Sequence, residues 1–184
     1  YSPLRELSAK VTEKPAHIFP IKDALLYVED DRLGGRGKSS MGEMLYTADN
    51  PPFGATITYF FGEDIKSAKD LRQENEKKSR EEGKDEYYPT LDERRAEDRD
   101  KEAFLLFVIK DAKGDVVRKI RRPAKKGMGR VTWNLRHTTT SPIKLQEGEL
   151  GRYSSPDEGM LALPGTYKVE LFKNVEGAFT QLLD

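Results

Sequence analysis

The sequence contains no cysteine and only two histidines, His17 and His137, among its 184 residues. The absence of cysteine excludes a disulfide framework, a thiol nucleophile and a cysteine-ligated zinc site, and it leaves the cellular compartment open. Two isolated histidines do not build a histidine-rich metal site. We therefore expect neither a bound metal nor another cofactor.

Long apolar runs are also missing, because no segment approaches the ~20 residues that a membrane-spanning helix needs. The first residues, YSPLRELSAK, lack the apolar core of a secretory signal peptide and do not include an initiator methionine. We expect the sequence to be a piece of a longer protein, so the question of whether the parent chain carries a signal peptide is left open. The formal net charge is zero, so no overall field attracts nucleic acid or an anionic membrane.

The charged residues are concentrated in one segment. Charged residues make up 35% of the chain, and residues 63–102 alone hold 15 acidic and 11 basic side chains. Mixed charges with few large apolar residues predict a charged helical hairpin. Gly83 is expected to end its first helix, and Thr90 with Glu93 matches a capping box that opens the second.

We interpret the segment 63–102 as a solvated insertion, because helices carrying charges of both signs are usually exposed. Spacings of four residues favour the ion pairs Glu74–Lys78 and Glu76–Arg80. A disordered loop and a partner-binding arm are the alternatives. Tyr87 and Tyr88, beside the hinge, are the residues to examine for a contact.

The rest of the chain has the alternating pattern of short β-strands. Residues 1–50 are an extended lead-in interrupted by prolines, with one strand predicted near Ile21 to Val28. Further strands are predicted over residues 56–61, 103–109, 115–121, 130–136, 165–172 and 178–183. Tight turns are predicted at 111–114 and 174–177, where glycine permits a positive φ. Trp133 is expected to anchor a core between two sheets.

Two segments invite ligand-binding interpretations. Residues 31–39 end in Gly-Lys-Ser like a phosphate-binding loop, but Arg32 occupies the position of the first required glycine, and we favour a surface loop. The basic residues on and after the predicted strand 115–121 suggest nucleic acid, but no aromatic residue is interleaved with them. Lysines that discourage edge-to-edge pairing explain them as well, so we expect no nucleic-acid partner. The cluster comprises Arg118, Lys119, Arg121, Arg122, Lys125, Lys126 and Arg130.

Several phrases resemble known families. FLLFVIKDAKGDVVRKI, GMGRVTWNLR and LALPGTYKVEL resemble the immunoglobulin-like domain related to that of flagellar hook-capping proteins. SPLRELS, AHIFPIKDA and ADNPPFGATITYFF resemble the region after the propeller in bacterial sortilin-like β-propeller proteins, often labelled BNR-repeat glycosyl hydrolases. The resemblance implies a mainly β, immunoglobulin-like antiparallel sandwich over residues 51–184, interrupted by the charged helical hairpin.

The resemblance also implies a function. It predicts a non-catalytic accessory module of a larger secreted or periplasmic protein, with the β-propeller of the same parent chain as its partner. The glycosidase label transfers to no residue here, because no propeller motif lies within the sequence. The alternative is a carbohydrate-binding module, which needs a planar row of exposed aromatic side chains. Its candidate residues are Tyr46, Phe53, Tyr87, Tyr88 and Tyr153.

Overall fold

The structure, a computed structural model, describes residues 5–27, 51–85, 87–140 and 159–183. The fold is mainly β and contains two antiparallel sheets. The three-stranded sheet has the order β1 (Ala16–Ile18), β2 (Ala55–Phe61) and β5 (Gly127–Trp133). The four-stranded sheet has the order β4 (Val116–Pro123), β3 (Phe104–Lys110), β6 (Lys168–Val175) and β7 (Ala178–Leu183).

The core forms where the apolar faces of the two sheets meet. Alternation along β2 turns Ile57, Tyr59 and Phe61 inward, as predicted, and they join one cluster with Leu105 and Phe107 of β3. The rings of Tyr59 and Phe107 lie 4.9 Å apart between centroids. Strand β3 is central in its sheet, which explains why its sequence is apolar at nearly every position.

Trp133 extends the core toward one end of the sheets, and its predicted role as a core anchor is confirmed. Its side chain is 3% exposed and packs in a second cluster with Ile109 and Val117 of the other sheet. The indole N–H donates to the carbonyl of Arg136 at 2.9 Å, so the buried donor is satisfied. The ring of Tyr167 approaches it edge-on at 5.0 Å between centroids.

The lead-in covers the outer side of the three-stranded sheet. Phe60 points away from the main core, and Val11 and Phe19 close over it in a small buried cluster. A short helix, α1 (Ala9–Thr12), precedes β1. The strand predicted near Ile21 to Val28 is wrong in its described part, residues 21–27, because the lead-in strand lies earlier and pairs with Tyr59–Phe61. Pro20, which lacks a backbone donor, follows the paired segment.

Both predicted tight turns form. The Asp111 carboxylate accepts from the backbone amides of Lys113 and Asp115, each at 2.9 Å, and Gly114 has φ +92°. Glu176 and Gly177 form a two-residue hairpin loop with φ +52° and +89°, the conformation that matches the twist of paired strands.

Two strand boundaries differ from the sequence prediction. The strand predicted over 130–136 runs from Gly127 to Trp133, because Leu135 has φ +55° and turns the chain. The strand predicted over 165–172 runs from Lys168 to Val175, where it pairs with the full length of β3. The backbone turn at Leu135 limits β5, and pairing with β3 sets the extent of β6.

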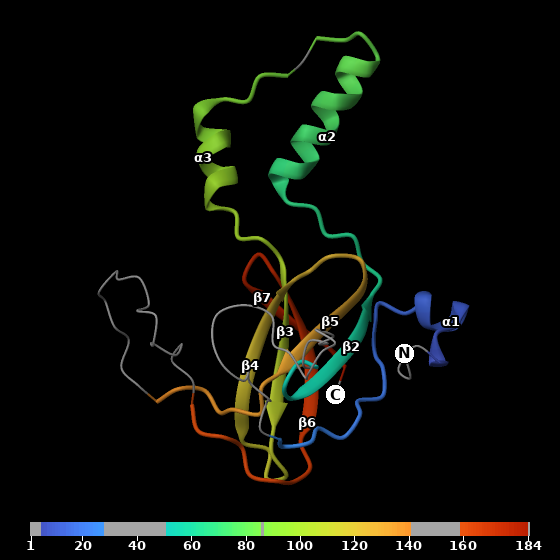
Figure 1. Ribbon diagram of the computed structural model, residues 1–184. Coiled ribbons are helices and arrows are strands. Elements are labelled where there is room, and N and C mark those ends of the chain that lie inside the picture. Colours follow the sequence, from blue (N-terminus) through green and yellow to red (C-terminus); the bar gives the residue numbers. More distant parts are fainter. Residues whose placement is uncertain (1–4, 28–50, 86, 141–158, 184) are drawn as a thin grey trace, which may run out of the picture.

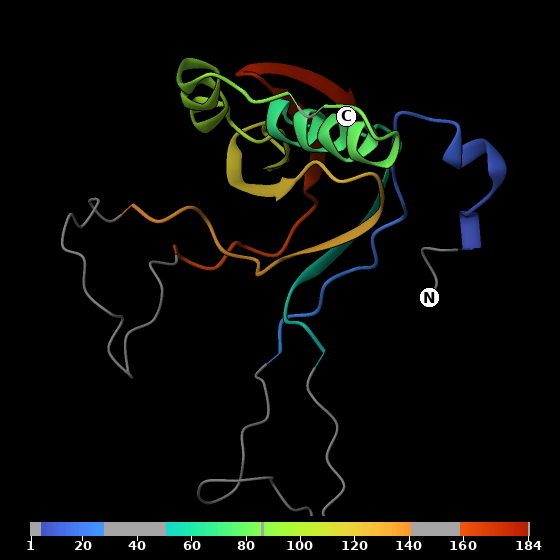
Figure 2. The ribbon, with the colours of Figure 1, turned by 90° about the horizontal axis from the view of Figure 1, so that it is seen from above.

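Two helices, α2 (Ala68–Glu81) and α3 (Leu91–Arg99), lie between β2 and β3 in the sequence. They stand beyond one end of the sheets, and the segments 19–27 and 159–167 lie toward the opposite end (Figure 1). Seen from above, α2 and α3 lie over the end of the sheets (Figure 2). Neither helix has a buried residue.

The core contact between the sheets can be tested with two phenylalanines of the four-stranded sheet. Phe107 is 0% exposed and Phe179 is 59% exposed. Phe107→Ala should lower the free energy of unfolding by about 3–5 kcal/mol, because it leaves a cavity between the sheets. Phe179→Ala should cost about 1 kcal/mol or less, since it loses one edge-on contact with Phe104. Urea denaturation followed by Trp133 fluorescence measures both, and equal effects would contradict the packing described.

Candidate functional site

Residues 63–102 form an arch over the end of the sheets, and we use the term arch for this segment. Each of its helices begins with a capping box. Thr90 and Glu93 exchange the predicted reciprocal bonds at α3, and Ser67 and Asp70 form a second box at α2. Gly83, with φ +66°, follows the C-terminal end of α2. The predicted cap of the second helix is confirmed.

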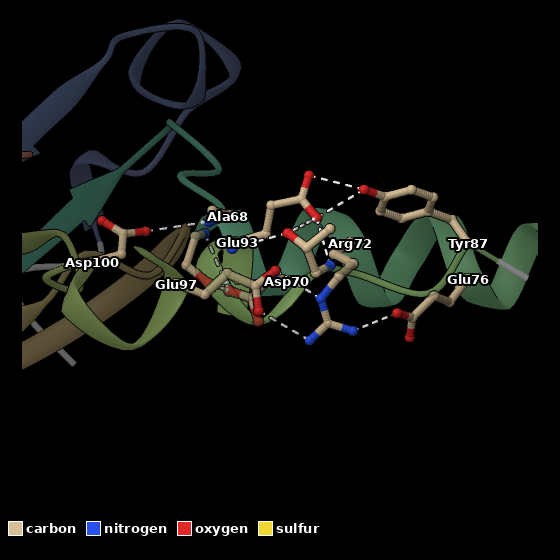
Figure 3. A network of polar contacts seen from close by, with 10 residues as sticks. Ala68, Asp70, Arg72, Glu76, Tyr87, Glu93, Glu97 and Asp100 are labelled. Atoms are coloured by element: carbon tan, nitrogen blue, oxygen red, sulfur yellow. Dashed lines mark hydrogen bonds and ion pairs between the residues drawn. The ribbon is translucent and has the colours of Figure 1, made fainter. Parts of the chain in front are cut away.

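One arginine joins the two helices. The Arg72 guanidinium of α2 donates to the Glu97 carboxylate of α3 through Nε at 2.7 Å and through a second nitrogen at 3.1 Å (Figure 3). Its remaining terminal nitrogen donates to Glu76, one turn further along α2. A planar guanidinium suits this two-point contact, which a lysine ammonium cannot reproduce. Glu76 therefore pairs with Arg72, and Glu74 binds Lys66 at 2.6 Å.

Hydrogen bonding lowers the pKa values of four arch carboxylates, those of Asp70, Glu74, Glu93 and Glu97. The bonds from Arg72 hold the pKa of Glu97 below its ordinary value. The Thr90 backbone amide, the Tyr87 hydroxyl and the Thr90 side chain lower the pKa of Glu93 in the same direction. Tyr87 donates to both oxygens of Glu93 at 2.8 Å, and that bond raises the pKa of the phenol.

A cleft of about 1380 Å³ lies between the arch and the end of the sheets. Its apolar lining comes from Ile65 and Leu71 of the arch and from Ala124 and Val175 of the sheet end. A smaller hollow of about 330 Å³ adjoins it, because Glu102, Ala103 and Pro123 line both. The lining of the smaller hollow also includes Phe104, Arg121 and Arg122.

The predicted ligand-binding aromatics are spread over the molecule. Tyr87 and Tyr88 lie in the arch, 60% and 86% exposed. Phe53 packs against Tyr27 with ring centroids 5.5 Å apart and a tilt of 58°. Its segment precedes β2 at the end away from the helices (Figure 1). Tyr46, Tyr153 and the phosphate-loop-like segment 31–39 lie outside the described residues.

The basic cluster lies on β4 and around the turn into β5. Strand β4 is at the edge of the four-stranded sheet, where cations that discourage strand pairing are expected. The Arg121 guanidinium lies 3.8 Å from the centroid of the Phe104 ring. Arg118 donates to the carbonyl of His137 at 3.0 Å.

Sequence reasoning missed three features of this region. The Ser67–Asp70 box has a readable signal, a serine three residues before an acid at the start of a helix. The link between Arg72 and Glu97 has no local signal, because 25 residues separate the two. The proximity of Lys101 to the loop that carries Lys125 and Lys126 follows from the fold alone.

Searches with this chain found no matching family model, no matching curated protein and no matching solved structure. Among the described residues, no group of three or more histidine or acidic side chains is placed to hold a metal ion. The described helices include none with the length and apolar character to cross a membrane.

The connection between the helices can be tested by removing the arginine. Arg72→Met should make the backbone amides of both α2 and α3 exchange severalfold faster with deuterium, because the two helices lose the side-chain link through the guanidinium. Lys77→Met is the matched control, since Lys77 is exposed and lies 3.9 Å from Glu81 of its own helix. If α3 exchanged at an unchanged rate in Arg72→Met, the link would not hold the arch together.

The depressed carboxylate pKa values predict the acid sensitivity of the arch. A carboxylate whose pKa is lowered by folding stabilises the fold above its ordinary pKa, near 4.5, and this contribution is lost as the pH falls through the lowered value. Helical ellipticity should therefore decrease below about pH 4.5, before the sheets unfold. Glu97→Gln should show a smaller decrease, because part of the acid-sensitive contribution is already absent. A larger decrease in Glu97→Gln would contradict this assignment.

Proposed function

We propose that this chain is a non-catalytic accessory module that makes protein contacts within a larger secreted or periplasmic protein. In the finer form of the proposal, its two sheets are an immunoglobulin-like sandwich with the arch as an insertion, and its partner is the β-propeller of the same parent chain. The phrases around the 111–114 turn and the Trp133 strand support this form, because they resemble such proteins. The two antiparallel sheets are consistent with it.

The observation that carries the proposal is a set of strongly exposed aliphatic side chains toward the end of the sheets opposite the arch. Leu25 and Leu26 are 76% and 61% exposed, and Met160 and Leu163 are 81% and 79% exposed. Their segments, 19–27 and 159–167, both lie toward this end (Figure 1). Large apolar side chains that are so strongly exposed at one end of the sheets support a protein contact there.

The carbohydrate-binding alternative requires coplanar exposed aromatic rings. The Tyr87 hydroxyl is held by Glu93 within the arch, and the ring of Phe53 is tilted against Tyr27. Phe53 and the arch tyrosines lie toward opposite ends of the molecule. No observation on the described residues favours this alternative over a protein contact.

The test begins with the coding sequence on the 5′ side of the Tyr1 codon, which should encode propeller repeats. In the parent protein, the amides of residues 20–27 and 160–166 should exchange at least about tenfold more slowly than in the isolated module, because the interface excludes water. Leu25→Ser combined with Leu26→Ser should reduce that protection in the parent protein.

Leu91→Ser is the matched control, because Leu91 is 65% exposed and lies on α3. It should leave the protection of residues 20–27 and 160–166 unchanged. A coding sequence without propeller repeats would contradict the finer form of the proposal. Identical exchange at these segments in the module and the parent protein would contradict the interface itself.

A further inference from the structure

His17 lies in the edge strand β1, on the outer side of the three-stranded sheet. Its neighbours Ala16 and Ile18 pack in the core between the sheets, so the alternation along the strand turns His17 to the other face. There it is paired with Phe60, over which the lead-in closes (Figure 1). The imidazole ring meets the ring of Phe19 edge-on, with centroids 4.8 Å apart. A titratable side chain therefore takes part in the contact between the lead-in and the sheet.

One nitrogen of this imidazole is left without a hydrogen bond. Nε2 of His17 is buried, and it has no hydrogen-bond partner among the described residues. A buried polar atom without a partner loses its hydration and gains nothing in return, in either tautomer of the ring. Such atoms are uncommon in folded proteins. The lead-in therefore gains stability in any state that gives Nε2 a partner.

An acidic side chain lies within reach of this nitrogen. The Oε2 atom of Glu6 is 3.9 Å from Nε2 of His17, and a movement of about 1 Å would bring the two atoms to hydrogen-bond distance. The Glu6 side chain is 55% exposed, which leaves it room for this movement. An ionised carboxylate only accepts hydrogen bonds, so Nε2 must carry a proton to bind it. The bond is strongest when the imidazole is charged.

The other charged side chains near this contact are exposed. Strands β2 and β7, which pack against β1, contain no charged residue. On β5 the register places Arg130 on the same face of the sheet, opposite Thr58. The remaining charged residues of the lead-in up to β1 are Arg5, Lys10, Glu13 and Lys14, all exposed. Water and salt screen exposed charges, so Glu6 has the largest influence on the protonation of Nε2.

Two effects act on the charged form of His17 in opposite directions. Partial burial disfavours the imidazolium, whereas the carboxylate of Glu6 favours it. The His17 side chain keeps 20% of its surface exposed, so its charge is not fully dehydrated, and the bond to Glu6 also satisfies the unpaired nitrogen. An imidazole takes up its proton near pH 6.5, where a glutamate side chain is ionised. The attraction to Glu6 is therefore available at the pH at which His17 becomes charged.

We propose that His17 and Glu6 form a pH-sensitive switch that holds the lead-in on the three-stranded sheet. As the pH falls from about 7.5 to about 5.5, Nε2 of His17 takes up a proton and donates to the Glu6 carboxylate. The lead-in is then held more tightly, and this stabilisation is lost as the pH rises again. The inference does not depend on the proposed propeller contact, which uses other segments. Either proposal can fail its test while the other passes.

Hydrogen exchange of the whole chain at about pH 5.5 and about pH 7.5 tests the switch. After correction for the intrinsic exchange rate at each pH, the amides of residues 9–19 should be about threefold or more better protected at the lower pH. Residues 104–110 of β3 are the internal reference, and their protection should not change. Both pH values lie above the range in which the arch carboxylates become protonated. Equal protection of residues 9–19 at the two pH values would overturn the proposal.

Matched variants identify the groups that carry the pH dependence. His17→Gln keeps a polar side chain that cannot become charged, so the pH dependence of residues 9–19 should disappear. His137→Gln, which replaces the other histidine of the chain, should retain it. Glu6→Gln should abolish or reverse it, because burial alone opposes the imidazolium. Glu13→Gln, at an exposed acid of the same lead-in, should retain it. Loss of the pH dependence in either control, or its persistence in His17→Gln, would overturn the proposal.

A direct measurement of protonation separates this switch from a role of His17 in packing alone. The ring protons of His17 and His137 can be followed by nuclear magnetic resonance as the pH is changed. In Glu6→Gln, the midpoint of the His17 titration should move to lower pH, because the neighbouring negative charge is gone. The midpoint for His137 should stay where it is in the unmodified chain. A His17 midpoint that is unchanged in Glu6→Gln would show that the two side chains are not coupled and would overturn the proposal.

Discussion

The packing of one apolar sheet face against the other determines where every other part of the molecule can lie. Tyr59 and Phe107 meet at the centre of this contact, and neither sheet alone could bury its inward side chains. Because the strands of both sheets end at the edges of this contact, the turns and connections between strands lie at the two ends of the sheets. The arch stands at one end, and exposed leucines lie at the other.

The arch is stabilised by a different kind of interaction. Its helices contribute no buried residue to a core, so their order depends on capping boxes and on the contact of Arg72 with Glu97. Such contacts weaken when a carboxylate is protonated or when salt screens the charges, whereas buried apolar side chains carry no charge to titrate or screen. The molecule therefore combines a base held by apolar packing with an appendage held by hydrogen-bonded charges. That difference allows the arch to be perturbed without unfolding the sheets.

Much of the fold could be predicted from the sequence, because strands and turns leave local patterns. The alternation in residues 55–61, the glycine turns and the Trp133 anchor all formed as expected. The lead-in strand was misplaced, because its position depends on pairing with the far end of β2. For the same reason, the cleft between the arch and the sheets could not be predicted. The cleft forms where segments that are distant in the sequence lie side by side, and no local sequence pattern indicates which segments these are.

The contact between the two sheets is the central claim of this account, and nuclear magnetic resonance tests it directly. Nuclear Overhauser effects should be recorded between the ring protons of Tyr59 and Phe107, whose ring centroids lie 4.9 Å apart. Cross-peaks between the two rings are the predicted result, and their absence in the folded protein would contradict the packing of the two sheets.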